Sequence, residues 1–222
     1  RNLCFRSGIP FTIKGKLCTG AWLSGHFIIK LTTGHWSLTI INYLCPMENV
    51  KPYNDFGDFL RKVFPCKVQK ISINAGFTCP NRDGSKGWGG CTYCNNQTFS
   101  PEYCHTEKSV TEQLEEGIRF FSRKYPEMKY LAYFQAYTNT YDELSSLKAK
   151  YEEALSYPGV VGLIVGTRPD CMPDALLDYF TALSREKFVM IEYGLESTLD
   201  KTLLRINRGH TYEESENAIR RT

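Results

Sequence analysis

Three cysteines with a compact spacing are the residues of this sequence best suited to chemistry. Cys91 and Cys94 form a Cys-x2-Cys pair, and Cys79 precedes them in the segment GFTCPNRDGSKGWGGCTYCNN. Thiolates at the Cys-x2-Cys spacing reach one metal centre. Three ligands leave one iron of a [4Fe-4S] cluster open, and an open iron can bind the amino and carboxylate groups of S-adenosylmethionine (SAM). The spacing therefore predicts a cluster held by Cys79, Cys91 and Cys94.

A zinc knuckle is the alternative reading of the same residues. Structural zinc takes a closed set of four ligands, and Cys104 or His105 could supply the fourth. A knuckle does not explain why the cysteine loop directly follows the first strand of a β/α series. The loop also holds glycines that let its backbone wrap closely around a bulky inorganic core: Gly84, Gly87, Gly89 and Gly90.

Strands and helices alternate from Lys67 onward. The stretches with strand patterns are Lys67–Ala75, Tyr130–Phe134, Val160–Val165 and Val189–Tyr193. A capping box at Ser109 and Glu112 opens the first intervening helix. Further helices are expected at Tyr141–Leu155, after Pro173, at Leu199–Asn207 and at Thr211–Arg221. This order predicts a parallel sheet with right-handed crossovers, either a β/α barrel or a doubly wound open sheet.

Polar, motif-like residues follow the end of each predicted strand. They lie in Gly76–Cys94, Gln135–Thr140, Thr167–Asp170 and Gly194–Ser197. Active sites of β/α folds lie at the carboxyl ends of the strands, so we expect one site built from four consecutive loops. The pattern stops at Thr222 without a closing element, and we expect the chain to be truncated from a longer protein.

The charge distribution divides the chain near Met47. Residues 1–46 contain five basic residues and no acid, whereas all 24 acids lie in 47–222. We interpret 1–46 as a non-native or disordered extension, with a transit peptide as the alternative. Residues 47–222 are the expected catalytic part. Charged and polar side chains interrupt the apolar stretch 21–44, which argues against a membrane span.

The composition is that of a globular protein with reduced cysteines. The chain is 42% hydrophobic and 23% charged, and its net charge of +3 gives no independent support for a nucleic-acid partner. Nine cysteines, an odd and unevenly spaced set, fit a disulfide framework poorly and suit a reduced cytoplasmic compartment. The cysteines outside the loop are interpreted as buried or incidental thiols, at Cys4, Cys18, Cys45, Cys66 and Cys171.

The segments quoted above resemble the radical SAM superfamily, and within it the YhcC/YtqA-type family, over about residues 48–222. The usual superfamily spacing is Cys-x3-Cys-x2-Cys; the longer first gap here is similar to that of the YhcC/YtqA and Elongator catalytic-subunit groups. The resemblance implies a partial (β/α)6 barrel of the TIM-like type. It also implies an enzyme that cleaves SAM with a [4Fe-4S] cluster to generate a 5′-deoxyadenosyl radical.

The resemblance also implies a set of SAM-binding residues. Tyr93 would pack against the adenine, and Gln135, Thr138 and Asn139 stand where the superfamily has its Gly-Gly-Glu motif, although no acid is present here. The other candidates follow later strands, at Arg168 in a GTRPD stretch, at Glu192, Glu196 and Ser197, and at Arg208 in an RGH turn. Several of these residues also admit structural roles: Arg168 could pair with Asp170, and Gln135 and Asn139 could satisfy a local turn.

Substrate and partners follow only from the resemblance. The GTRPD and RGH stretches resemble the Elongator catalytic subunit, which implies RNA modification, with a tRNA wobble uridine as the candidate target. A flavodoxin or ferredoxin would donate the electron. The alternatives are a radical SAM enzyme acting on a small metabolite or protein, and a non-catalytic zinc or iron-sulfur binding module.

Overall fold

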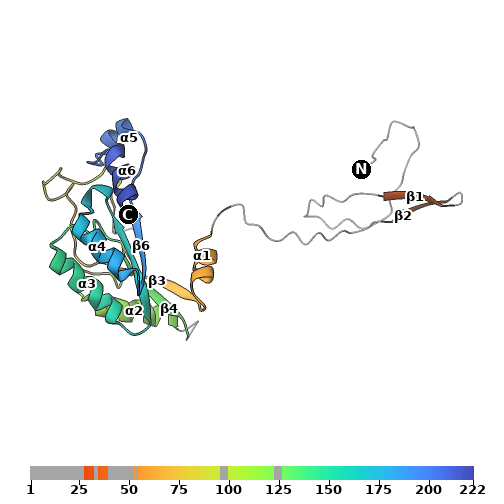
Figure 1. Ribbon diagram of the computed structural model, residues 1–222, viewed down its shortest axis with the longest axis horizontal. Helices are drawn as coiled ribbons and strands as arrows, with labels where there is room; N and C mark the ends of the chain where they lie inside the picture. Colours follow the sequence, from red (N-terminus) through yellow and green to blue (C-terminus); the bar gives the residue numbers. More distant parts are fainter. Residues whose placement is uncertain (1–27, 33–34, 40–52, 54, 96–99, 123–126) are drawn as a thin grey trace. The chain divides into compact units, whose positions relative to one another are not determined.

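The computed structural model describes residues 28–32, 35–39, 53, 55–95, 100–122 and 127–222 (Figure 1). The chain divides into two units, Arg1–Tyr53 and Asn54–Thr222. In the first, β1 (Ile28–Thr32) pairs antiparallel with β2 (His35–Thr39). The remainder of the predicted extension 1–46, and its boundary at Met47, lie outside the described residues.

The second unit is built on an open parallel sheet. Its strands are β3 (Val68–Ile73), β4 (Lys129–Phe134), β5 (Val160–Thr167) and β6 (Phe188–Tyr193). They lie in the order β3-β4-β5-β6, so each strand neighbours the next one in sequence. All three pairings are parallel. The predicted β/α order and the parallel sheet are therefore confirmed, and among the described residues the sheet does not close.

The helices are α1 (Phe56–Val63), α2 (Val110–Ser122), α3 (Leu144–Ser156), α4 (Asp174–Leu183), α5 (Asp200–Arg205) and α6 (Tyr212–Arg221), with a short 3-10 helix η2 (Pro169–Cys171). Figure 1 shows α2, α3 and α4 on one face of the sheet and α1 on the other. Helix α6 packs against η2, just after β5. Among the described residues, no helix has the length and apolar character needed to cross a membrane.

The face under α2, α3 and α4 carries the main hydrophobic core. Ala132 and Phe134 of β4 point to this face and are fully buried. The ring of Phe134 meets Tyr151 of α3 edge-on, with ring centroids 5.1 Å apart. Leu176 of α4 completes this layer with no exposed surface. Burial of side chains of this size contributes about 1.5–3 kcal/mol each, which fixes the helices against the sheet.

Helix α1 covers the opposite face of the sheet. Leu60 packs against Val68, Leu131 and Ile164, which come from three adjacent strands. The helix begins after Asp55, whose carboxylate accepts a hydrogen bond from the Gly57 amide at 2.7 Å. The sequence analysis did not predict this helix, because its eight residues are short for a periodicity argument.

Capping boxes define two helix starts. The amide of Ser109 donates to the Glu112 carboxylate at 2.7 Å, and the Glu112 amide donates back to the Ser109 hydroxyl at 3.1 Å. This confirms the predicted start of α2. Helix α6 begins with the same arrangement between Thr211 and Glu214. Both boxes satisfy amides that a helix leaves without partners, so the chain leaves each loop in a fixed direction.

Candidate functional site

The cysteine loop folds back on itself so that its ends meet. The Arg82 amide donates to the Cys79 carbonyl at 2.8 Å, and the Gly90 amide donates to the Asn81 carbonyl at 2.8 Å. These bonds place the residues around Cys79 beside those that precede Cys91. Gly90 has a φ of +82°, a conformation that favours glycine, and the Arg82 side chain occupies the space that a Cβ would need.

A turn after α5 holds the two ends of the loop together. The Asn81 side-chain amide donates to the carbonyl oxygens of Asn207 and Arg208, at 2.6 and 2.9 Å. The Asn207 side chain donates to the Gly90 carbonyl at 2.9 Å. Asn207 has a φ of +53°, which asparagine tolerates better than most residues. Residues far apart in sequence thereby fix the position of Cys91.

Nitrogen donors surround two of the three cysteine sulfurs. Arg208 Nη1 lies 3.6 Å from Cys91 Sγ, and Asn81 Nδ2 lies 3.7 Å from it. Arg82 Nη2 lies 3.4 Å from Cys94 Sγ, and this contact raises the pKa of Arg82. Positive charge and N–H donors stabilise thiolates and tune iron-sulfur clusters. The setting therefore suits sulfurs that ligate a metal cluster.

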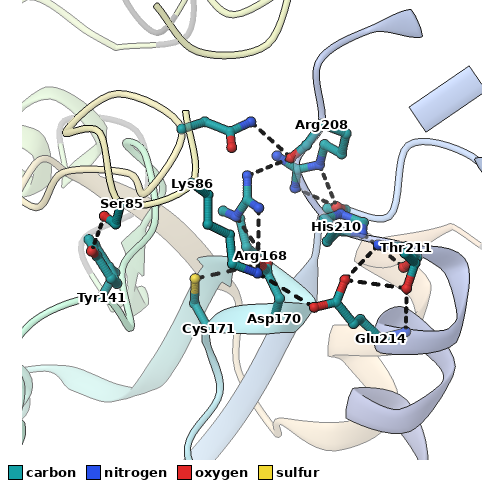
Figure 2. Close-up of polar contacts among 12 residues, drawn as sticks. Ser85, Lys86, Tyr141, Arg168, Asp170, Cys171, Arg208, His210, Thr211 and Glu214 are labelled. Atoms are coloured by element: carbon teal, nitrogen blue, oxygen red, sulfur yellow. Dashed lines mark hydrogen bonds and ion pairs between the residues drawn. The ribbon is translucent and has the colours of Figure 1, made fainter. Parts of the chain in front are cut away.

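A buried ion-pair network lies behind the loop (Figure 2). Arg168 binds Asp170 through two parallel contacts of 3.0 and 2.8 Å, and each side chain is only 2% exposed. Burial alone would raise the pKa of Asp170, but hydrogen bonds from Arg168 and Lys86 outweigh it and lower that pKa. Lys86 also reaches Glu214. Arg168 Nη1 donates to the Arg208 carbonyl at 2.7 Å, so the network supports the turn that holds the loop.

The loop after β4 carries two buried oxygens without partners. The Thr138 amide donates to the Thr78 carbonyl and the Asn139 amide to that of Gly166, both at 3.2 Å, which ties this loop to the cysteine loop after β3 and to β5. Yet Thr138 Oγ1 and Asn139 Oδ1 are buried and have no hydrogen-bond partner. Leaving such atoms unpaired costs about 1–3 kcal/mol each, so a group that donates hydrogen bonds to them would bind favourably here.

Three predicted residues gather around Cys91. Burial raises the pKa of Tyr93; the charge of Arg208 lowers it, whereas Cys91 and Glu196 raise it. Arg208 donates from Nη2 to the Gly194 carbonyl at 2.5 Å, and the Glu196 carboxylate lies beside Gly194 as well. Tyr93 is 49% exposed, so its ring remains open to a partner.

The remaining predicted residues are engaged elsewhere. Arg168 pairs with Asp170, as its structural alternative proposed. Ser197 caps the backbone before α5 by accepting from the Leu199 amide at 3.1 Å. Gln135 lies 3.5 Å from the Ser72 hydroxyl. Glu192 accepts a hydrogen bond from Tyr133 on the sheet face. Their expected contacts with SAM stay predictions.

Sequence analysis missed four residues that position the site. Asn81, Arg82, Lys86 and Asn207 each bind a group distant in the chain. The RDGSKG stretch has the composition of an ordinary turn, so nothing local marks its basic residues. The asparagine at the end of α5 offered a weak signal, because asparagine often adopts a positive φ after a helix.

An open cleft of about 630 Å³ lies beside Cys79. Thr78 and Pro80, the neighbours of Cys79, contribute to its lining together with Lys86, Tyr141 and Asp170. Ser85 and Tyr141, whose hydroxyl oxygens lie 2.6 Å apart, also line the cleft (Figure 2). The cleft thus combines residues from the cysteine loop with residues that follow β4 and β5.

Three free thiols suit an iron-sulfur cluster, in which each thiolate binds a different iron. A zinc knuckle would need a fourth ligand. Among the residues that the structure describes, no three His, Cys, Asp or Glu side chains converge to hold a single metal ion. The thiol of Cys104, a candidate fourth zinc ligand, donates a hydrogen bond to the Ser72 carbonyl at 3.0 Å. Burial raises the pKa of this thiol to about 12.

Comparison with known families agrees with this geometry. The family model described as "Radical SAM superfamily" matches residues 75–222, which include the cysteine loop and three strands of the open sheet, β4, β5 and β6. The chain belongs to the radical SAM superfamily. Its open four-stranded sheet is part of the TIM-like fold of that superfamily, and membership implies an enzyme that uses SAM and an iron-sulfur cluster.

Curated relatives come from distant organisms. The chain is 45% identical over 167 residues to protein YhcC of Escherichia coli, covering 75% of this chain and 53% of the relative. It is 36% identical over 180 residues to YtqA of Bacillus subtilis, covering 79% and 56%, and 32% identical over 171 residues to MJ0486 of Methanocaldococcus jannaschii, covering 76% and 52%. The chain therefore spans about half the length of the curated relatives it matches. No solved structure matches it.

Proposed function

We propose that Cys79, Cys91 and Cys94 hold a [4Fe-4S] cluster with one open iron, at which SAM binds. The proposal rests on two observations taken together. Three thiols are free, and two buried oxygens, those of Thr138 and Asn139, have no hydrogen-bond partner. A reduced cluster with bound SAM supplies the reductive cleavage of SAM to a 5′-deoxyadenosyl radical that takes a hydrogen atom from the substrate.

The chain's own residues bind and orient SAM. Thr138 Oγ1 and Asn139 Oδ1 are acceptors suited to an amino group, and they replace the acid that the usual motif supplies. Tyr93 offers an exposed ring beside Cys91 for the adenine. Arg208 and Asn81 direct N–H donors at the Cys91 sulfur, and donors of this kind tune iron-sulfur clusters. Glu196 lies beside Gly194, where a hydroxyl-rich ribose finds an acceptor.

The substrate that we propose is an RNA base, a tRNA wobble uridine. The support is the likeness of Gly166–Asp170 and Arg208–His210 to stretches of the Elongator catalytic subunit. The structure joins these two stretches, because Arg168 donates to the Arg208 carbonyl. We further propose that the enzyme works in the cytoplasm with a flavodoxin or ferredoxin as electron donor.

The test is anaerobic reconstitution of the full chain with iron and sulfide, followed by EPR of the reduced protein with and without SAM. We expect a [4Fe-4S] signal that changes on addition of SAM, and formation of 5′-deoxyadenosine. Cys91→Ala removes the signal, whereas the matched control Cys66→Ala, a free thiol outside the loop, keeps it. Zinc without labile sulfide would instead identify a zinc module. SAM cleavage that no tRNA stimulates would contradict the RNA substrate and leave the cofactor chemistry standing.

A further inference from the structure

The sheet face that α1 partly covers carries both apolar and polar side chains. The apolar ones include Val68, Leu131, Ile164 and Met190. Side chains two residues apart along a strand point to the same face. Lys70 of β3, Tyr133 of β4 and Glu192 of β6 each come two residues after one of these apolar residues, so they lie on this face as well.

These three side chains form one connected group. The Tyr133 hydroxyl donates to Glu192 Oε2 at 2.7 Å, although their strands are separated by β5. Gly166 stands in register with Glu192 on that strand and has no side chain to separate them. Lys70 Nζ lies 3.6 Å from Glu192 Oε1 and 4.1 Å from the centroid of the Tyr133 ring.

Fold stability does not account for this group. The side chains of Lys70 and Glu192 are 33% and 37% exposed, and an ion pair this open contributes only about 0–1 kcal/mol. Burial raises the pKa of Tyr133, and Glu192 raises it further, so the phenol keeps its proton and holds the carboxylate. The group is ordered and accessible, and it places a cationic donor beside an anionic acceptor.

We propose that Lys70 and Glu192 bind the hydrogen-bonding edge of a uracil base of the substrate, with Tyr133 as the positioning residue. This inference rests on the proposed RNA function and assigns to Glu192 a substrate role in place of the expected SAM contact. The Glu192 carboxylate accepts from the imide N3–H, and the Lys70 ammonium donates to the adjacent carbonyl oxygen. No covalent bond changes in this step.

The same pair of side chains discriminates against cytosine. Cytosine presents its N3 as an acceptor, so the Glu192 carboxylate would face a lone pair with no proton between them. An unmatched acceptor pair that the bound base shields from water costs more than the lost hydrogen bond, since neither atom recovers its water. A matched pair of contacts of this kind discriminates between bases by about tenfold or more.

The experiment measures binding of two anticodon stem-loop RNAs that differ only in uridine or cytidine at the wobble position. Fluorescence anisotropy with the reconstituted full chain gives both dissociation constants without turnover. We expect the uridine RNA to bind about tenfold tighter. Glu192→Gln should bring the ratio close to one, because an amide can turn to donate or accept. Lys70→Met should weaken the uridine RNA about tenfold, and Tyr133→Phe should reduce the ratio about threefold.

Exposed residues of the same types supply the controls. Lys201→Met and Glu186→Gln should leave both affinities within about twofold, since both residues are exposed and lie outside the strands of this face. Thermal melts show whether each variant is folded, and Tyr133→Phe keeps the packed ring if another variant fails. Equal binding of both RNAs by the wild type, or an unchanged ratio in Glu192→Gln, overturns the uracil site alone. Binding of neither RNA, with SAM cleavage intact, overturns the RNA substrate and this site together.

Discussion

The side-chain amide of Asn81 donates to the carbonyl oxygen of Arg208 at 2.9 Å, across 127 residues of sequence. Arg208 in turn directs Nη1 at the sulfur of Cys91. Asn81, two residues after Cys79, therefore orders the turn that places the Arg208 guanidinium beside Cys91. The loop and the turn after α5 act as one unit, and damage to either should weaken binding of the proposed cluster.

Removal of the Asn81 amide should loosen this unit. Asn81→Ala takes hydrogen bonds from Asn207 and Arg208 in a buried site, and we expect a loss of about 1–3 kcal/mol in the free energy of unfolding. Iron bound per chain after reconstitution should fall as well. Urea titration and iron analysis measure the two effects. Asn95→Ala, an exposed change next to Cys94, should alter neither, and normal iron content in Asn81→Ala would contradict the positioning role.

The Arg168–Asp170 pair should be costly to break. Asp170→Asn leaves the guanidinium of Arg168 buried without its counter-charge, and Lys86 loses a contact of 2.5 Å. Removing one partner of a buried pair destabilises a protein by about 3–5 kcal/mol. Chemical denaturation should show this loss, and Asp178→Asn, an exposed change on α4, should stay within about 0.5 kcal/mol of the wild type. A stability loss below about 1 kcal/mol would show that the pair is not buried in solution.

Thr138→Val should separate ligand binding from stability. Thr138 Oγ1 is buried without a partner, so replacing the hydroxyl with a methyl group removes an unsatisfied polar atom. The protein without SAM should be as stable as the wild type or more stable, by up to about 1 kcal/mol. The dissociation constant for SAM should rise about tenfold, because the variant lacks the acceptor. Calorimetry measures the binding, and an unchanged SAM affinity would remove Thr138 from the SAM site.

His210 should give the fold a dependence on pH. Burial lowers the pKa of His210 below the ordinary value of 6.5, and the charges of Arg208 and Arg168 lower it further. The hydrogen bond with the Thr211 carbonyl raises this pKa but does not offset the other effects. Below pH 6.5 the unfolded chain binds a proton that the folded protein does not, so the free energy of unfolding falls as the pH falls. In His210→Gln this part of the slope should disappear. The exposed His105→Gln should keep it, and equal slopes in the wild type and His210→Gln would contradict the assignment.

The elements that sequence analysis predicted share a feature, namely a signal carried within a few residues. The apolar run that became β5 and the capping box of Ser109 and Glu112 are local patterns, and the structure confirms both. Helix α1 was not predicted because its stability comes from the packing of Leu60 on the sheet. A short stretch of sequence does not contain the residues on which Leu60 packs. For the same reason, the sequence could not predict which polar side chains lie at the cysteine loop and which lie on the sheet face with Tyr133.

The sequence by itself determined the superfamily and the β/α order, because motif spacing and the periods of strands and helices are local properties. The three cysteine ligands are predicted from the same kind of local spacing. Only the tertiary structure decided which polar residues are already paired. Arg168 is bound to Asp170 and Glu192 to Tyr133, whereas the oxygens of Thr138 and Asn139 are left without partners. Whether a buried polar atom is satisfied depends on groups that folding brings from distant parts of the chain.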